Sequence, residues 1–330
     1  MKYIVNIILL LLVMMIGLMF GDGFIHPVEI VKSFAGQSDT YTNLIIRSLR
    51  LPRVLLAIIA GATLGVAGCL LQRITKNELA SPDVIGISQG AVVGSLFFLI
   101  ILTTATEQLL FPIAFQSIAS IVGAILVTFV LYHFALKCTF LKERLILLGI
   151  CMNIFFQGII MFLIMSSNKR SAQAQIWITG SVHLAEYYQV IVITLIIIIV
   201  MIVMAYYTRH LDIHQLGYSM SHGLGLSYQS MTILTLVCVS ILTAISVSFV
   251  GGIQFVGLIA PHIAKKIKHH SFTQFVFTSG VIGGVILLLS DLIGRTIFLP
   301  VEIPAGVFTA LIGAPFFMYL LFSKRFKSLR

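Results

Sequence analysis

The sequence predicts an all-α polytopic membrane protein, and three observations carry that prediction. Only 32 of the 330 residues are Asp, Glu, Lys or Arg, and most of these fall in gaps between long apolar runs. The chain is 59% hydrophobic with a mean hydropathy of +1.08, which leaves too few polar side chains to cover a soluble protein of this size. The runs reach about 20 residues, enough for a helix to cross a bilayer, and they are too uniformly apolar for barrel strands.

We expect about ten transmembrane helices. The predicted segments are 3–20, 52–72, 83–104, 113–136, 145–165, 188–207, 229–250, 253–264, 273–298 and 305–323. The first resembles a signal peptide but lacks a small-x-small cleavage pattern, so we interpret it as a retained helix. The third is expected to begin at Ser81-Pro82-Asp83, which has the residue types of an N-cap, a first-position proline and an acidic first turn. The eighth is too short to span alone, so we expect it to extend into its neighbours or to be partly re-entrant.

The second segment carries a stripe of small residues, in which Ala57, Gly61 and Gly65 are four residues apart and Gly68 follows. Small side chains on one face let the backbone of another helix approach closely. We therefore expect this stripe to be a helix-packing surface and not a ligand site.

The basic residues predict the orientation of the chain. With both termini in the cytoplasm, 14 Lys and Arg residues fall on the inner side and 7 on the outer side. The net charge of +10 is scattered over short gaps, so it indicates topology and not a nucleic-acid partner. Arg47, Arg50, Arg53 and Arg295 depart from the rule because they lie at outer helix ends. Charge alone leaves two interpretations for them equal: snorkelling at the interface, or docking of an acidic partner.

Motifs for catalysis and for cofactor binding are missing. The sequence has no G-x-x-x-x-G-K-[ST] loop, no G-x-G-x-x-G and no clear catalytic cluster, so we expect a chain that is not an enzyme and needs no cofactor. His210 and His214 have the spacing of two metal ligands on a helix, but Asp212 faces elsewhere, and we favour a solvated loop without metal. The cysteines at 69, 138, 151 and 238 lie in or beside apolar runs, which favours packing over disulfides.

Polar residues inside the predicted spans are few. Asn153 and Gln157 are one helical turn apart, and they either bond a neighbouring helix or line a pathway. Asp291 and Arg295 are also four apart, and we expect an ion pair near the outer surface. The mid-span regions contain no Asp or Glu, which counts against an ion-coupled secondary transporter, the alternative from another functional class.

The longest gap on the predicted cytoplasmic side, 208–228, contains Leu-Gly twice, at Leu216-Gly217 and Leu224-Gly225. This pattern is typical of two short helices that each end with Gly at the C′ position. A membrane protein without an ATP-hydrolysing motif needs a surface that receives force, and this gap is the candidate. We expect proline at Ser219 to break one of the two helices.

Seven blocks of sequence together resemble one known family. In order they are LRLPR at 49–53, GATLGVAG at 61–68 with Gln72, NELASP at 77–82, GISQGA at 86–91, GIQFVGLIAPH at 252–262, EIPAGV at 302–307 and GAPFF at 313–317. The chain resembles the permease subunits of type II ABC importers for iron-siderophores, haem and cobalamin, the FecCD/BtuC family. The similarity covers nearly the whole chain.

The resemblance implies one permease domain over 1–330, with the BtuC-like fold, in the bacterial cytoplasmic membrane. The implied partners are a second permease (a copy or a paralogue), two ABC ATPases, an extracytoplasmic binding protein and membrane lipid. The implied cargo is an iron-siderophore complex, with haem or cobalamin as the alternative.

The resemblance also assigns residues. Arg50, Arg53 and Arg295 match the family's outer docking arginines, which moves the open interpretation toward docking. The segment 209–228 matches the ATPase-coupling helices, and its positions are Leu216, Gly217, Ser221, Leu224 and Gly225. The inner-gate positions match Asn77, Leu79, Lys142 and Glu143, while Asn153 and Gln157 are our candidates for the pathway lining.

The chain departs from the family pattern at a few positions. The family's Asn-Pro-Leu-Ala has Glu78 in place of proline, and the Arg after Pro-His is Lys265. In the coupling segment, Tyr218 replaces an acidic residue and Ser221 replaces an alanine. We therefore expect the coupling contact to differ in detail from the family's usual one.

Overall fold

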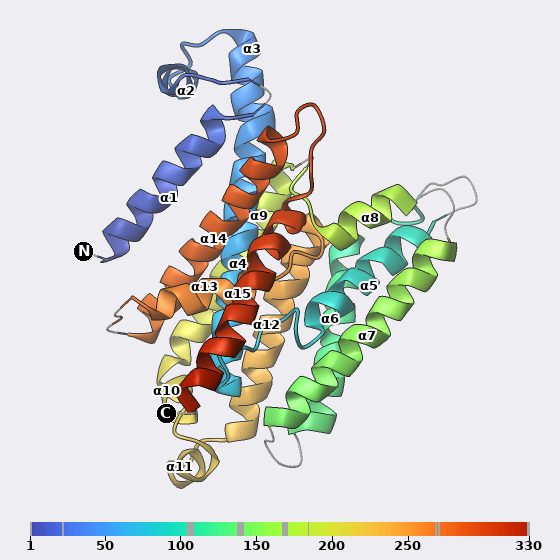
Figure 1. Cartoon of the computed structure of the whole chain (residues 1–330), viewed down its shortest axis with the longest axis vertical. Coiled ribbons are helices and arrows are strands. Elements are labelled where there is room, and N and C mark those ends of the chain that lie inside the picture. The colour runs from blue at the N-terminus through green and yellow to red at the C-terminus, as the bar shows by residue number, and fades with distance from the viewer. Residues whose placement is uncertain are drawn as a thin grey trace.

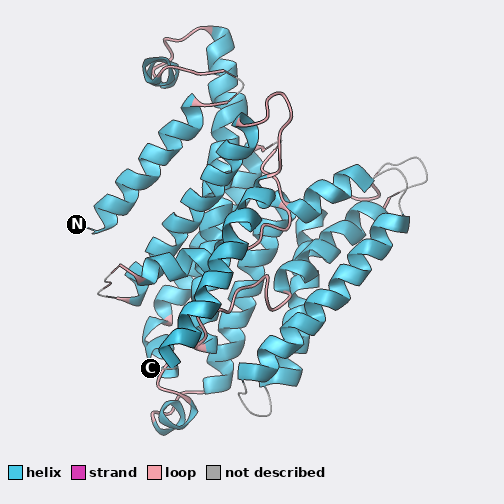
Figure 2. Cartoon of the chain, viewed as in Figure 1, coloured by secondary structure: helices cyan, strands magenta, loops and turns pink. Residues whose placement is uncertain are grey.

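The computed structural model describes residues 2–21, 23–103, 109–136, 142–166, 171–183, 185–267, 269 and 271–328. Over these residues the chain is helical, with short connections and no strand (Figure 2). The predicted all-α class is confirmed.

Ten helices coincide with the ten predicted segments: α1 (Lys2–Met19), α4 (Leu51–Thr75), α5 (Ile87–Ile101), α6 (Phe115–Leu131), α7 (Lys142–Ser166), α9 (Tyr187–Tyr206), α12 (Tyr228–Val250), α13 (Val256–Lys265), α14 (Phe272–Thr296) and α15 (Ala305–Ser328). Six helices are long and apolar enough to cross a membrane, and three shorter apolar helices accompany them within the described chain. The protein is a multi-pass membrane protein, and the figure of ten spans stays a prediction.

Four shorter elements lie outside the predicted segments: α2 (Pro27–Phe34), α3 (Thr40–Asn43), η1 (Leu44–Arg50) and α8 (Ser171–Thr179). A fifth, η2 (Tyr132–Leu136), continues α6 within the predicted segment 113–136. Figure 1 shows α2 and α3 at one end and α10 (Thr208–His214) and α11 (Tyr218–Gly223) at the other. We call these the α2/α3 end and the α10/α11 end.

Helix α4 runs through the centre of the bundle and packs against α12, α13 and α14 (Figure 1). Its small-residue stripe is the reason for the close approach. A Cβ on Gly61 would lie 2.4 Å from the carbonyl oxygen of Gly283, and one on Gly65 would lie 2.4 Å from that of Ser279. The predicted packing surface is therefore confirmed at these positions.

Two helix starts differ from those predicted. The second segment begins well before residue 52, because α3, η1 and α4 form one continuous helix over 40–75. Pro52 is tolerated inside it because the preceding turn is π-helical, with Leu51 N–H donating to Ile46 five residues back.

The third segment begins later than predicted. Residues 82–86 form turns, and α5 starts at Ile87 after Gly86, whose φ of +84° lies outside the helical region. Ser81 Oγ accepts from Val84 N–H, so the expected N-cap closes a tight turn instead.

The eighth segment is short, as predicted. Helix α13 spans 10 residues, and the chain before it, Gly251 to Gln254, is neither helical nor exposed. Irregular backbone at this depth is tolerated only inside protein, which agrees with the expectation of a partly re-entrant element.

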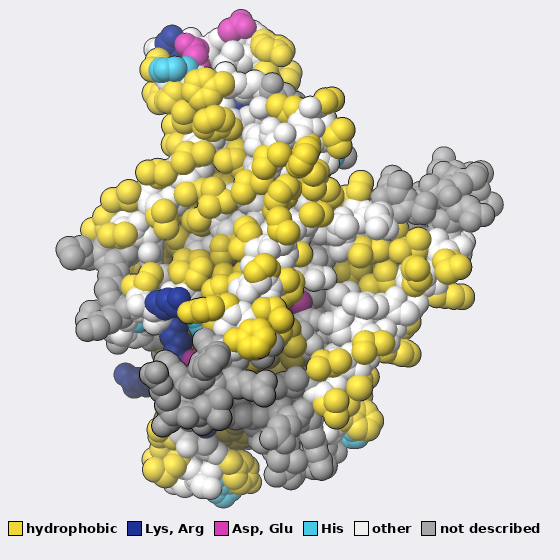
Figure 3. Space-filling view, viewed as in Figure 1, with side chains coloured by type: hydrophobic (Ala, Val, Ile, Leu, Met, Phe, Trp, Pro, Cys, Tyr) yellow, Lys and Arg dark blue, Asp and Glu magenta, His cyan; other side chains and the backbone are white. Residues whose placement is uncertain are grey.

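The surface of the molecule agrees with a membrane environment. Figure 3 shows apolar side chains over most of the visible face and charged side chains gathered toward the ends. Large apolar residues are exposed on α1, α6, α7 and α9 in particular. Such broad apolar exposure suits lipid or protein neighbours and not water.

Candidate functional site

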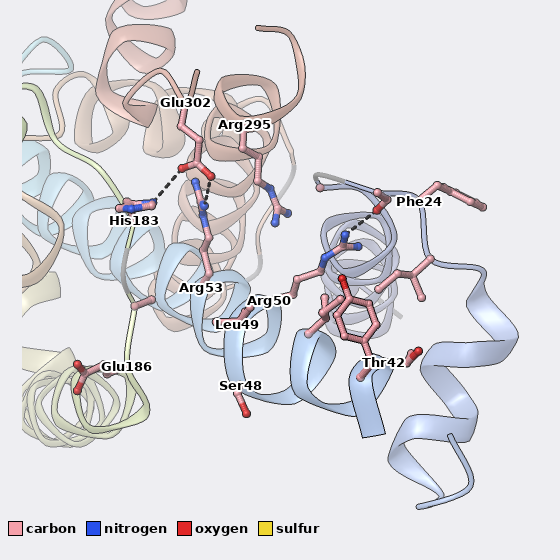
Figure 4. Close-up of a pocket in the computed structure, with 16 residues that line it drawn as sticks. Phe24, Thr42, Ser48, Leu49, Arg50, Arg53, His183, Glu186, Arg295 and Glu302 are labelled. Carbon is pink, nitrogen blue, oxygen red and sulfur yellow. Dashed lines mark hydrogen bonds and ion pairs between the residues drawn. The ribbon is translucent and has the colours of Figure 1, made fainter. Parts of the chain in front are cut away.

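At the α2/α3 end, a cavity of about 770 Å³ is lined by Arg50, Arg53, His183, Arg295 and Glu302, among others. Figure 4 shows these side chains converging from η1, α4, α14 and two loops. All three arginines that the sequence proposed for docking therefore line one cavity.

Arg53 is the hub of a charged network in this cavity. Its Nε and Nη2 donate to the carboxylate of Asp291 at 2.9–3.1 Å, and its Nη1 donates to Glu302 Oε1 at 3.0 Å. The other oxygen of Glu302 lies 3.0 Å from His183 Nδ1 (Figure 4). Burial raises the pKa of Glu302, but Arg53 and His183 outweigh that effect, so its pKa lies below the usual value.

Arg50 and Arg295 lie deeper in the protein and bond mainly to backbone. Arg50 donates to the carbonyls of Leu18, Met19 and Gly23 at 2.5–3.0 Å. Arg295 donates to Gly17 O at 2.6 Å, and its Nε lies 3.6 Å from Asp291 Oδ2. The predicted ion pair of Asp291 with Arg295 is confirmed, although Asp291 is only 2% exposed and its closest partner is Arg53.

Sequence reasoning missed Glu302 and His183. They join the network from loops 119 residues apart, and no helical periodicity could pair them. The only signal was the EIPAGV block, which carries Glu302 but says nothing of its partners.

A second cluster lies between the chain following α4 and the start of α13. Asp83, which was expected in the first turn of a helix, is buried and accepts from the backbone N–H of Phe255 at 2.8 Å. Phe255 has a φ of +63°, so the carboxylate stabilises a strained residue at the beginning of α13. Asp83 lies in the turn before α5 and Asp291 near the end of α14, so neither is at the middle of a span, and both are buried and hydrogen-bonded.

Asn153 joins this cluster from α7, because its Nδ2 donates to Asp83 O at 2.8 Å. It therefore makes the bond to a neighbouring segment that was one of its two open interpretations. Gln157 donates to Asn153 Oδ1 at 3.4 Å and is exposed. Phe155, on another face of α7, is also exposed at 60%. Helix α7 is thus open on several faces within this chain.

The predicted gate loop is fixed by local bonds. Asn77 Oδ1 accepts from Leu79 N–H at 3.0 Å, a turn that asparagine favours. Glu78 pairs with Lys265 at the end of α13. Glu78 and Lys265 are both positions at which the chain departs from the family pattern. The two substituted residues therefore form an ion pair with each other. Lys142 and Glu143 begin α7, but their side chains lie outside the described part of the chain.

The segment predicted for ATPase coupling forms two short helices, as predicted. Gly225 has a φ of +74° and follows α11 at C′, where Leu226 N–H donates to Ser221 O and Gly225 N–H to His222 O. Gly217 has a φ of +103° but serves as the N-cap of α11 and is not at C′ of α10. Leu216, Tyr218, Met220 and Leu224 are each about 60% exposed, which gives this end an apolar surface.

His214 is not in a solvated loop. It is buried, stacks on Tyr228 at a centroid distance of 3.9 Å and lies 2.9 Å from Thr232 Oγ1 through Nε2. Burial, with help from Lys76 and Arg73, lowers the pKa of His214 to about 4, so the ring is neutral near pH 7. The solvated-loop interpretation is therefore wrong for this histidine, which packs α10 onto α12.

A family model and several known proteins match this chain over most of its length. The FecCD transport family matches residues 9–323. A Bacillus subtilis protein named "Probable siderophore transport system permease protein YfhA" is 36% identical over 314 residues, which cover 95% of this chain and 92% of that protein. The B. subtilis iron(3+)-hydroxamate import system permease protein FhuG is 33% identical over 319 residues, covering 96% and 95%.

A solved structure of a metal-chelate type ABC transporter in an inward-facing conformation has the same fold. It superposes with a TM-score of 0.79 at 23% identity and covers 96% of this chain and 97% of its own. The resemblance inferred from the sequence blocks is confirmed by these matches. The chain belongs to the FecCD transport family.

Proposed function

We propose that this chain is the permease subunit of an ATP-driven importer that moves iron-siderophore complexes into the bacterial cytoplasm. The observation that carries the proposal is similarity over the whole chain to permeases named for siderophore, iron-hydroxamate and iron-citrate transport. In this assignment the chain is one permease domain over 1–330, with 209–228 as its coupling segment and both termini in the cytoplasm. ATP is hydrolysed by two separate ATPase subunits.

The test is transport by the reconstituted assembly. The chain is purified with its partner permease, ATPases and binding protein, placed in proteoliposomes and supplied with radioactive iron on hydroxamate, catecholate and citrate chelators. We expect ATP-dependent uptake of at least one iron chelate and none of haem or cobalamin. Uptake of haem or cobalamin alone would refute the siderophore assignment while leaving the permease assignment intact.

We also propose that the binding protein docks over the cavity at the α2/α3 end. The cavity lies at the end of the bundle opposite the coupling helices, and Arg50, Arg53 and Arg295 line it together. Since the guanidinium groups already bond within the chain, Arg50 and Arg295 would position this surface. Arg53 is 14% exposed and Glu302 is 30% exposed, so a carboxylate of the binding protein would join the Arg53–Glu302–His183 network at its rim.

At the opposite end, we propose that α10 and α11 insert into the ATPase subunit. The support is the apolar exposure at Leu216 and Leu224 and the rigid turn set by Gly225 and the buried Ser221. Ser221 Oγ donates to Ile213 O, which joins the two helices into one unit.

A proline in α11 tests this contact. Ser221 N–H donates to Gly217 O, so Ser221→Pro removes that bond and should cost about 3 kcal/mol of local stability. We expect loss of transport-linked ATP hydrolysis while binding-protein docking is kept. The control is Ser219→Pro, because Ser219 lies in the first turn of α11, where proline is tolerated. The position of Ser219 thus makes it a control, although the sequence alone predicts that proline there breaks a helix. Equal loss in both variants would contradict the assignment.

We propose that α7 borders the translocation pathway, with Asn153 and Gln157 on its polar face, and that Asn77, Leu79, Lys142 and Glu143 lie at the inner gate. Neutral amides suit a pathway that must pass a polar chelate without trapping it. A cysteine at Gln157, in a background without the native cysteines, should react with a water-soluble thiol reagent in a manner that changes with nucleotide. Cysteine at Phe155, which lies on another face of α7 and is 60% exposed, is the comparison. Identical labelling of both positions in every state would contradict a pathway role for Gln157.

A further inference from the structure

A groove between α1, α4, α9 and α14 has a volume of about 610 Å³ and is lined almost wholly by apolar side chains. Its wall includes Leu11, Ala62, Val66, Ile198 and Phe277. Leu11 and Ile198 are about half exposed, so the groove opens to the side of the bundle. Apolar hollows of this kind do not hold water, because water finds no hydrogen-bond partner there. A lipid acyl chain in a bilayer fits such a groove.

A second cavity, of about 690 Å³, lies toward the α10/α11 end. Its lining includes Cys69, Arg73, Lys76, Lys265 and Phe272. On α4, the groove residues Ala62 and Val66 are followed by Cys69 and Arg73 at spacings of four, three and four. These spacings place all four on one helix face. The second cavity therefore continues the groove along the same face of α4.

The second cavity carries an excess of positive charge. Its charged lining residues are Arg73, Lys76, Lys265 and Glu78. Arg73 pairs with Asp212 and Lys265 pairs with Glu78, whereas Lys76 has no ion pair among the described residues. Figure 3 shows Lys and Arg side chains gathered beside apolar surface toward this end of the molecule.

Arg73 points to the kind of ligand. Its side chain is only 8% exposed, and its guanidinium lies 3.5 Å from the ring centroid of Phe272. Its Nε–H is buried and has no hydrogen-bond partner among the described residues. A buried donor without an acceptor is costly, and a phosphate oxygen is a strong acceptor for guanidinium.

We propose that an anionic phospholipid binds along this face of α4. Its acyl chain occupies the groove, and its headgroup phosphate accepts from Arg73 Nε–H beside Lys76. Basic pockets between transmembrane helices on the cytoplasmic side are suited to such headgroups. Because Arg73 also bonds Asp212 of α10, the headgroup would lie next to the coupling helix. A lipid, and not a free anion, is the occupant because the apolar groove and the basic cavity share one helix face.

Native mass spectrometry of the complete transporter in mild detergent tests the proposal, with phosphatidylglycerol, phosphatidylcholine and inorganic phosphate as probes. We expect phosphatidylglycerol to be retained over phosphatidylcholine, and Lys76→Gln to lower that retention about fivefold. Ile198→Trp should fill the groove and lower retention of both lipids. The matched controls are Lys266→Gln, which is exposed outside the cavity, and Ile199→Trp, which is 58% exposed on α9 but does not line the groove.

The outcomes separate the sources of phosphate. Loss of lipid in the test variants and not in the controls supports the site. Equal retention of the two lipids, or retention unchanged in both test variants, overturns it. Binding of inorganic phosphate without any retained lipid would also overturn it, since it would indicate a free-anion site. None of these readings depends on which chelate is transported.

Discussion

Replacing Gly68 with alanine is expected to destabilise the protein by about 3 kcal/mol or more, at or above the upper end of the usual cost of overpacking. A Cβ at this position would lie 1.7 Å from the carbonyl oxygen of Gly257, and 2.5 Å and 2.7 Å from its carbonyl carbon and Cα. All three are backbone atoms of α13, so no side-chain rotation relieves the clash. The whole of α13 would have to move away from α4.

Thermal unfolding in detergent and abundance in the membrane measure this effect. Gly158→Ala in α7 is the matched control, since a Cβ there meets nothing within 4 Å. That change should be neutral or stabilising by about 0.5–1 kcal/mol, because alanine is the better helix former. Similar melting temperatures for the two variants would show that α4 and α13 are not in backbone contact.

Replacing Asp291 with asparagine is the second large effect that we expect. The carboxylate is 2% exposed and faces both Arg53 and Arg295, which are 14% and 4% exposed. Without this negative charge, the positive charges of two buried guanidinium groups lose a carboxylate partner. The free energy of unfolding should fall by about 3–5 kcal/mol. The melting temperature and the amount of folded protein should both fall.

An exposed ion pair provides the control for this change. Lys32 and Glu29 pair on α2 with side chains 48% and 41% exposed, so Glu29→Gln should cost less than about 1 kcal/mol. If Asp291→Asn were equally mild, the network would be a surface feature and not part of the core.

The same reasoning applies to a charge reversal at Arg295. Replacing Arg295 with Glu would place a buried carboxylate beside Asp291, so loss of uptake in that variant could not be assigned to docking.

The helices were predictable because the bilayer imposes a length and a polarity that any sequence must show. The stripe of Gly61, Gly65 and Gly68 was equally readable, since helix packing depends on residues at fixed local spacing. The start of α5 was misplaced because Ser-Pro-Asp suits both a helix N-terminus and the tight turn that the chain forms. Local chemistry could not distinguish the two, because Asp83 is held by Phe255, 172 residues away.

The same limit applies to the candidate site. Arg50, Arg53 and Arg295 were predicted as candidates because they depart from the positive-inside rule. Their partners were not found, since backbone carbonyls and the distant Glu302 leave no periodic trace. Burial of His214 was missed for a related reason: its stacking on Tyr228 is a tertiary contact that the polar composition of the segment concealed.

The pairing of Glu78 with Lys265 has a consequence for hybrid permeases. A segment exchange that brings the family's proline to position 78 but keeps Lys265 would remove the carboxylate that pairs with the Lys265 ammonium group. The reciprocal exchange would place the family's arginine opposite Glu78, where the ion pair can still form. Chimeras with relatives should therefore carry 77–80 and 261–265 as one inherited block, even though the two stretches are separated by most of the chain.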